Sequence, residues 1–381
     1  MFRRGITLSV DPSTPSGDPC VELKEDIQNF AESSVAPLCA PPPSPIDPPL
    51  SHGKFGTISR IEEDPTKLLK QARVGLYVQK EVCDTWALPK LKKLFQEYKK
   101  EKAQVETFQT LRPSFPLYLP DLGKVQECRE AEGALPIVRY LMEKVEGETF
   151  INFLNSQKES PNYLETILGG FIQAFYFLLF SNLQGYFHND IKLDNLMLRI
   201  WKGPETVILP SLVLATKELR LTLLPPLRTP VFIDYAFSKR IAENFFPLEA
   251  FKLVAKFYAY FSGEEERSEE DNYLLGYFRD IFEKIPEIYR LFPEAEMLER
   301  MINEPRGSIA SILETLPPVL ETPEFGIKMV QFVENLWTRV AGFPLHLAMN
   351  FSTPLRGGGK TSYKEAYLKY KLKYLLEKRK I

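Results

Sequence analysis

The chain changes character near Gly147, and this change constrains its fold more than any other feature. Before Gly147, short runs of about six residues, rich in apolar and β-branched side chains, are separated by Pro- and Gly-containing breaks, which is typical of strands. One long helical pattern, at about 88–111, lies among them. After Gly147, helical patterns fill most of 249–348. We therefore expect an α+β chain in which a small β-rich part, 50–146, precedes a larger and mostly helical part, 147–352.

Two further segments flank these parts. Prolines, which lack an amide donor, recur from residue 11 to residue 49, so we interpret residues 1–49 as mostly a flexible arm. A short helix within residues 20–35 that docks on the body is the alternative. Residues 353–381 contain three consecutive glycines, which suit a hinge, followed by a basic Lys/Tyr/Leu-rich helical pattern. That C-terminal helix is expected either to pack on the body or to dock on a partner, an anionic surface or nucleic acid.

The charge balance excludes one class of function. With 48 basic and 50 acidic residues the net charge is −2, so the molecule as a whole does not attract nucleic acid or anionic lipid.

The most apolar run of the chain, 171–180, has about half the length of the roughly 20-residue segments that cross a bilayer. The N-terminus lacks an apolar stretch of signal-peptide length. We expect no transmembrane segment.

The cysteine pattern argues against a zinc site. Four cysteines lie far apart without a Cys-x-x-Cys pair, and there are only three histidines to join them as ligands. So few thiols in a chain of this length suit a reducing compartment, because secreted chains usually carry a denser disulfide framework. The expected location is the cytoplasm.

A polar cluster lies in Phe-His-Asn-Asp-Ile-Lys-Leu-Asp-Asn, residues 187–195, directly before an apolar strand pattern. A carboxylate such as Asp190 can orient an attacking hydroxyl and accept its proton, and Lys192 can neutralise charge on a moving phosphoryl group. Asn195 offers an amide oxygen to magnesium, a hard cation that prefers oxygen ligands. An ordinary polar turn before a strand is the alternative.

A second acid, Asp234, ends the apolar run Thr-Pro-Val-Phe-Ile. A strand-ending aspartate is often only a turn former, but its position downstream of the polar cluster makes it a second candidate site residue. The sequence between the two motifs is strand-like with prolines at its ends, so we expect an inserted surface hairpin at about 201–229.

These motifs resemble the catalytic loop and the metal-binding segment of the protein kinase family. Earlier segments extend the resemblance. Gly53 and Gly56 are similar to the second half of a glycine-rich loop over the phosphates of ATP. Lys70, with Lys67 as the fallback, stands where kinases place the lysine that binds those phosphates, and Glu101 on the following helix is its expected partner.

Residues 140–150 resemble a kinase hinge. The resemblance implies that Met142 guards the adenine pocket, that the backbone of Glu143 and Val145 provides the acceptor and the donor for adenine, and that Gly147 lets the chain turn into the helical part. These segments follow one another in kinase order. The resemblance therefore implies a bilobal fold with ATP between the lobes, and magnesium held by the amide and the second acid.

Several positions depart from the family pattern. Asn189 replaces the arginine that receives a phosphorylated activation loop, Ala236 stands at a glycine position, and no Ala-Pro-Glu sequence follows. The activation segment is therefore short, which leaves a small-molecule phosphotransferase open, although Lys192 favours a Ser/Thr protein kinase. Ser51 in place of the first loop glycine leaves open a catalytically weak pseudokinase or virion scaffold.

The tail adds a resemblance of its own. A Gly-rich spacer followed by a Tyr/Lys-rich helix is similar to the C-terminal extensions of proteins from large cytoplasmic DNA viruses, some of which encode reduced kinases. This resemblance implies action in the host cytoplasm or packaging in the virion. The function expected from the sequence is transfer of the γ-phosphoryl group of ATP to Ser or Thr hydroxyls of proteins.

Overall fold

The computed structural model describes most of the chain between residues 19 and 353. The described residues are 19–33, 36–40, 45–53, 56–72, 88–131, 136–202, 206–215, 217–225, 228–235, 238–241, 245–303, 319 and 322–353. The predicted C-terminal helix, residues 1–18 of the predicted arm, and Ala236 lie outside these ranges.

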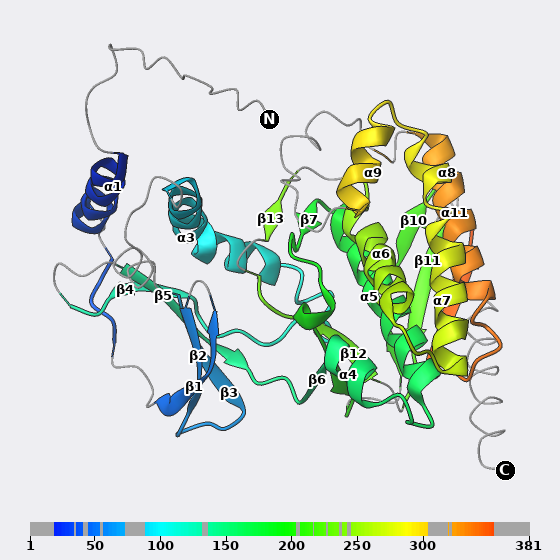
Figure 1. Cartoon of the computed structure of the whole chain (residues 1–381), viewed down its shortest axis with the longest axis horizontal. Coiled ribbons are helices and arrows are strands. Elements are labelled where there is room, and N and C mark those ends of the chain that lie inside the picture. Colours follow the sequence, from blue (N-terminus) through cyan, green and yellow to red (C-terminus); the bar gives the residue numbers. More distant parts are fainter. Residues whose placement is uncertain are drawn as a thin grey trace, which may run out of the picture.

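The first part of the chain forms an antiparallel sheet with two helices beside it (Figure 1). Its strand order is β1-β2-β3-β5-β4. The strands are β1 (Pro45–Gly53), β2 (Gly56–Ile61), β3 (Lys67–Ala72), β4 (Gln126–Arg129) and β5 (Pro136–Glu143), and the helices are α1 (Pro19–Ser33) and α3 (Leu88–Gln109). The interior strand β5 is almost wholly buried, in keeping with its mostly apolar sequence.

The second part is mostly helical. Its helices are α4 (Phe150–Ser156), α5 (Tyr163–Leu183), α6 (Leu248–Gly263), α7 (Glu269–Phe282), α8 (Pro286–Tyr289), α9 (Ala295–Asn303) and α11 (Pro323–Thr338). Phenylalanines fill its core: the ring of Phe171 on α5 meets those of Phe257 and Phe278 edge-on, with centroids 5.3 and 4.9 Å away. Together the two parts confirm the predicted α+β class.

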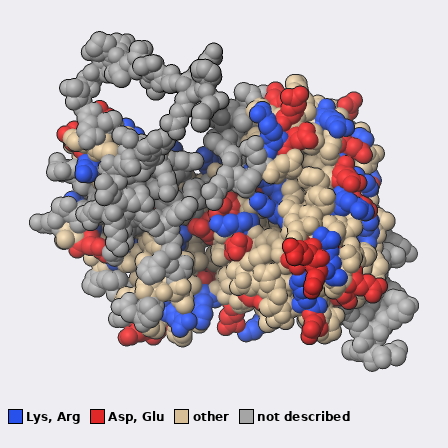
Figure 2. Space-filling view, in the orientation of Figure 1, with Lys and Arg blue, Asp and Glu red and all other residues tan. Residues whose placement is uncertain are grey.

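Helix α5 is the central element of the helical part. Among the described residues it is the one helix long and apolar enough to cross a bilayer, but most of its side chains are buried against its neighbours, as in the core helix of a globular protein. This is in keeping with the expectation of no transmembrane segment. On the face shown in Figure 2, acidic and basic side chains are interspersed, as the near balance of charge suggests.

Short strands of the second part carry the predicted motifs. The strands β12 (Arg228–Phe232), β8 (Leu196–Ile200) and β6 (Gly147–Thr149) form one sheet in that order, and β7 (Tyr186–Phe187) pairs with β13 (Lys239–Arg240). The polar cluster of residues 187–195 lies between β7 and β8, and its last three residues form the 3-10 turn Leu193–Asn195.

The predicted insertion is larger in structure than a surface hairpin. It contains β9 (Val207–Ile208), β10 (Leu212–Leu214) and β11 (Lys217–Leu223), and β14 (Leu347–Ser352), more than a hundred residues later, pairs along most of the length of β11. Leu214, Leu221 and Leu223 are fully buried. The hairpin itself is present in β10 and β11, but the surface position expected for it is wrong, because one face of the sheet is part of the core.

The N-terminal arm differs from the prediction. Helix α1 buries Leu23 and Ile27 in the same hydrophobic cluster as Phe95 of α3, so the docked-helix alternative holds for residues 19–33. Residues 36–40 run beside β4, where a disulfide joins Cys39 to Cys128. Cysteine content favoured a reducing compartment, and this disulfide departs from that expectation.

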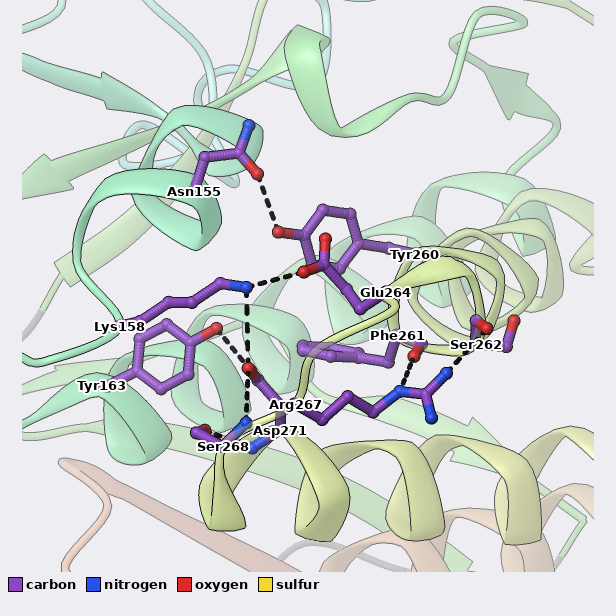
Figure 3. Close-up of polar contacts among 10 residues, drawn as sticks. All are labelled: Asn155, Lys158, Tyr163, Tyr260, Phe261, Ser262, Glu264, Arg267, Ser268 and Asp271. Carbon is purple, nitrogen blue, oxygen red and sulfur yellow. Dashed lines mark hydrogen bonds and ion pairs between the residues drawn. The ribbon is translucent and has the colours of Figure 1, made fainter.

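A buried polar network fixes the start of α5 against the junction of α6 and α7 (Figure 3). Asp271, only 1% exposed, accepts a hydrogen bond from the hydroxyl of Tyr163 at 2.9 Å and lies 3.7 Å from Nζ of Lys158. The same carboxylate forms a capping box with Ser268 at the first turn of α7. Burial together with Asp271 raises the pKa of the Tyr163 hydroxyl, which therefore stays protonated as the donor.

Candidate active site

The loop of residues 188–195 is held in place by one buried acid. Glu249, 1% exposed, lies in the first turn of α6. One of its oxygens accepts the backbone N–H of His188 at 2.9 Å and the side-chain amide of Asn182 at 3.0 Å, and the other accepts the backbone N–H of Asn189. The loop backbone is thus fixed by an ionisable group 60 residues away in sequence.

Asp190, Lys192 and Asn195 form one hydrogen-bonded group. Nζ of Lys192 and Nδ2 of Asn195 both donate to Oδ2 of Asp190, each at 2.9 Å. The amide of Asn195 also donates to the backbone carbonyl of Asp190 at 3.0 Å. Because the nitrogen of this amide faces Asp190, its oxygen points away from Asp190 and is a potential ligand for a cation.

Backbone strain lies at two positions of the site. Asn189 and Asp234 have φ angles of 66° and 67°, in the left-handed region that residues with a Cβ seldom adopt. Such strain persists only where the surroundings impose it, and it clusters at functional sites. Here it turns the chain just before Asp190 and just after β12.

Asp234 is held beside the loop through its own neighbour. The N–H of Ile233 donates to the carbonyl of Asn195 at 3.0 Å, and Nε2 of His188 lies 2.9 Å from the carbonyl oxygen of Ile233. The backbone of Ile233, the residue before the second acid, is therefore bonded to both ends of the polar loop. The two predicted metal ligands, Asn195 and Asp234, come from adjacent segments.

Lys70 on β3 connects this site to the first part of the chain. Its Nζ lies 3.1 Å from Oδ1 of Asp234, although 164 residues separate them. Burial alone would lower the pKa of Lys70, but the negative charges around it outweigh burial and raise it. Burial alone would raise the pKa of Asp234, but Lys70 lowers it, so both groups are charged at neutral pH. Lys67, the fallback, instead pairs with the exposed Asp64.

Glu101 on α3 lies on the other side of Lys70. The distance from its Oε1 to Nζ of Lys70 is 4.0 Å, at the outer limit of an ion pair. The Glu101 side chain is almost fully buried, and neither of its oxygens accepts a hydrogen bond from any residue that the structure describes. Burial raises the pKa of Glu101 to about 7, against the opposing effect of the Lys70 charge. The predicted partner therefore lies close to the lysine but is not its nearest acid.

The predicted glycine loop lies at the turn between β1 and β2. Gly53 and Gly56 face each other across this turn, and residues 54–55 lie outside the described ranges. A Cβ on Gly56 would be only 1.8 Å from the carbonyl oxygen of Gln71 on β3. Close approach of β2 and β3 therefore requires glycine at this position, whether or not a nucleotide binds nearby.

The predicted hinge follows β5. Glu143 is anchored there: its backbone N–H donates to the carbonyl of Asp121 at 2.7 Å, and its carboxylate lies 2.9 Å from Nη2 of Arg199. The side chain of Val145 is buried, and a Cβ on Gly147, whose φ is 153°, would be 2.1 Å from the carbonyl oxygen of Leu198. Glycine at 147 thus allows the chain to pass against β8.

A cavity of about 700 Å³ adjoins the hinge. Met142, Glu143 and Arg199 are among its lining residues, whereas Lys70 and Asp234 are not.

The donor chemistry of the site suits magnesium. The described residues contain no group of three His, Cys, Asp or Glu that could hold a metal ion, so an ion here would depend on the amide of Asn195 and one carboxylate together with ligands from outside the chain. Asp234 is ionised, and Lys70 contacts only its Oδ1. An ionised carboxylate and an amide oxygen on adjacent segments are hard ligands of the kind that magnesium takes, alongside water and phosphate oxygens.

Sequence reasoning missed Glu249. An acid in the first turn of an otherwise apolar helix, Leu-Glu-Ala-Phe-Lys-Leu-Val, is the signal that could have drawn attention to it. Comparison with models of known protein families finds no match for this chain, and comparison with curated proteins finds none either. Any function assigned to the chain therefore rests on the geometry of this site.

Proposed function

We propose that the protein is an ATP- and magnesium-dependent kinase that transfers the γ-phosphoryl group of ATP to Ser or Thr hydroxyls of proteins. The observation that carries the proposal is the 3.1 Å contact between Lys70 and Asp234. It brings a buried lysine of the first part to the acid beside the Asp190 loop, so that a phosphate-binding cation and the acids needed for phosphoryl transfer meet in one place.

Each residue has a role in this chemistry. Asp190 orients the substrate hydroxyl and accepts its proton, and Lys192, already 2.9 Å from Asp190, neutralises negative charge near the reacting group. Asn195 and Asp234 would hold magnesium, which when bound neutralises charge on the phosphates. Lys70 binds the phosphates of ATP, and Glu101 stabilises its charge from the side of α3. Glu249 positions the loop by accepting hydrogen bonds from the backbone N–H groups of the loop.

The fold is compatible with the bilobal kinase architecture. A five-stranded antiparallel sheet and a helix carrying Glu101 precede a helical part that carries the polar loop. In this proposal the sheet is the N-lobe, the segment after β5 is the hinge, and ATP binds between the two parts. If the viral resemblance of the tail is right, the enzyme acts in the host cytoplasm or in the virion.

A pseudokinase or scaffold is the second candidate, because the same Lys70–Asp234 contact also fits a permanent internal pair. Lys70 lies 3.1 Å from Asp234 and 4.0 Å from Glu101. In an active kinase, Lys70 would instead bind phosphate and Asp234 would bind the metal ion. A scaffold would keep this internal pairing permanently. A kinase would exchange it for contacts with ATP and magnesium.

The test is phosphoryl transfer from γ-labelled ATP by the purified full chain, with magnesium and a mixture of proteins. We expect label on Ser or Thr, and we expect Asp190→Asn to lower turnover by at least about a hundredfold, because positioning and electrostatics supply most of the catalysis in this reaction. Asp194→Asn is the matched control, since this exposed aspartate lies in the same loop and should leave turnover within about twofold of the parent.

Four other outcomes would count against the proposal. Equal loss in both variants, or no loss in Asp190→Asn, would reject the assignment of the base. Binding of nucleotide without any transfer would indicate the scaffold. Label found only on added small-molecule alcohols would indicate the third alternative, a small-molecule phosphotransferase.

A further inference from the structure

Among the described residues, the N-terminal segment contacts the sheet and α3 at two places. We call α1 together with residues 36–40 the N-terminal clamp. At the first place, the buried face of α1 packs on α3: Leu23 is 2% exposed and Ile27 6%, and both belong to one hydrophobic cluster with Phe95. Glu22 also lies 3.9 Å from Lys92 of α3. Figure 1 shows the two helices side by side.

At the second place, residues 36–40 extend the sheet beyond β4, its last strand. The N–H of Cys39 donates to the carbonyl of Arg129 and the N–H of Arg129 donates to the carbonyl of Pro37, both at 2.8 Å, in a parallel bridge. The disulfide between Cys39 and Cys128 makes this attachment covalent across 89 residues of sequence. An otherwise open sheet edge is covered in this way.

The clamp touches both elements that build the Lys70 environment. Arg139 on β5, 5% exposed, donates to the carbonyl of Ala40 at the end of the clamp and to Gln126 of β4. The next residue, Tyr140, is opposite Lys70 in the register of β3 and β5. On the other side, α1 packs on α3, the helix that carries Glu101.

The position of Glu101 depends on how α3 is packed. Neither of its carboxylate oxygens accepts a hydrogen bond from any residue in the described ranges, and its cationic partner there, Lys70, is 4.0 Å away. Within the described ranges, no hydrogen bond of the Glu101 side chain therefore fixes its distance from Lys70. The contacts that hold α3 against the sheet therefore set the distance between Glu101 and Lys70.

We propose that the N-terminal clamp positions α3, and with it Glu101, against Lys70, and that the Cys39–Cys128 disulfide is the latch of the clamp. Breaking the latch loosens α3 and weakens nucleotide binding, which makes the site sensitive to thiol reductants. A dithiol reductant supplies two electrons and two protons: the S–S bond breaks, both sulfurs become thiols, and the reductant becomes a disulfide. The consequence for nucleotide binding rests on the proposed function, whereas the positioning of α3 does not.

The test of the clamp is amide hydrogen exchange in α3, measured on the full chain purified without reductant. Variants are used in place of a reductant because Cys20 is disulfide-bonded as well. We expect Cys39→Ser and Leu23→Ala each to speed exchange in α3 by about tenfold, because local opening follows the loss of packing. Val21→Ala is the matched control, since Val21 lies in the same helix but is 47% exposed. Unchanged exchange in both test variants overturns the clamp.

Two further readouts complete the test. Peptide mapping of the unreduced protein should recover Cys39 joined to Cys128, and free alkylation of both cysteines would overturn the latch. The dissociation constant of magnesium-ATP should rise about fivefold or more in Cys39→Ser, the lower end of ordinary coupling between sites. If α3 loosens while the affinity stays at the parental value, the clamp holds α3 but does not control nucleotide binding. If the parent binds no nucleotide, the proposed function is wrong. Hydrogen exchange in α3 still tests whether the clamp positions this helix.

Discussion

Among single residues, Glu249 affects the largest number of groups in the site. Its carboxylate accepts the N–H groups of His188 and Asn189 and the amide of Asn182; the bonds from His188 and Asn182 are buried, and the bond from Asn189 is partly buried. Buried donors without an acceptor cost about 1–3 kcal/mol each. The geometry of the Asp190 loop therefore depends on a residue that takes no direct part in the proposed chemistry.

We predict that Glu249→Ala lowers the free energy of unfolding by about 3 kcal/mol, because it removes the acceptor of the backbone N–H groups of His188 and Asn189 and one acceptor of the Asn182 amide. Turnover should fall with it, since the loop is no longer fixed. Urea denaturation measures the first effect. Glu296→Ala is the control, because this exposed acid also lies in the first turn of its helix, α9, and should change stability by less than about 0.5 kcal/mol. Equal stability of the two variants would contradict the anchoring role.

Glu101 gives a prediction about pH. Its pKa is raised by burial from 4.5 to about 7, so the folded protein holds a proton that the unfolded chain releases between these values. The contribution of Glu101 to stability is therefore greatest at acid pH and declines as pH rises from about 4.5 to about 7. As pH rises through that window, the free energy of unfolding of Glu101→Gln should therefore increase relative to that of the parent. Denaturation of both proteins at pH 5 and pH 7 measures the difference, and a gap that stays constant would show that Glu101 has an ordinary pKa.

Among the elements, the contact of β2 with β3 has a specific requirement at Gly56. A Cβ there would collide with the backbone of Gln71, whereas a Cβ on Gly276 of α7 would meet no atom within 4 Å. We predict that Gly56→Ala destabilises the protein by at least about 2 kcal/mol, while Gly276→Ala stabilises it by up to about 1 kcal/mol through helix propensity. Thermal unfolding of the pair checks this, and a neutral Gly56→Ala would mean that the strands can separate.

The polar network of Figure 3 holds α5 and α7 together through Asp271. Asp271→Ala should lower the free energy of unfolding by about 3 kcal/mol, because it removes the cap of α7 and leaves the buried Tyr163 hydroxyl without its acceptor. Glu270→Ala, at an exposed position of the same first turn, is the matched control. Similar unfolding midpoints for the two variants would rule out a structural role for the network.

Across the whole molecule, the features that could be predicted from sequence are the local ones. Asp190, Lys192 and Asn195 lie within six residues, so their hydrogen bonds follow from one loop. The alternation of a strand places Lys67 and Lys70 on opposite faces of β3, whereas the contact of Lys70 with Asp234 joins residues 164 apart in sequence. The change of character at Gly147 correctly indicated an α+β chain.

Features that depend on distant partners could not be predicted. The role of Glu249 needs α6 to pack under a loop 60 residues earlier, and β14 joins the inserted sheet only because the chain returns there. The prolines around α1 favoured the expectation of a flexible arm. The helix is stabilised by the packing of its buried side chains, including Leu23 and Ile27, on α3 rather than by its own helix propensity. The disulfide likewise depends on tertiary contact between Cys39 and Cys128.

The central claim is that Lys70, Asn195 and Asp234 together bind magnesium-ATP. Titration calorimetry of the full chain with ATP, with and without magnesium, tests it most directly. We expect the parent to bind ATP more tightly when magnesium is present, and Asp234→Asn to lose that dependence while retaining its fold. Binding by the parent that is unaffected by magnesium, or a magnesium dependence that survives in Asp234→Asn, would contradict the account.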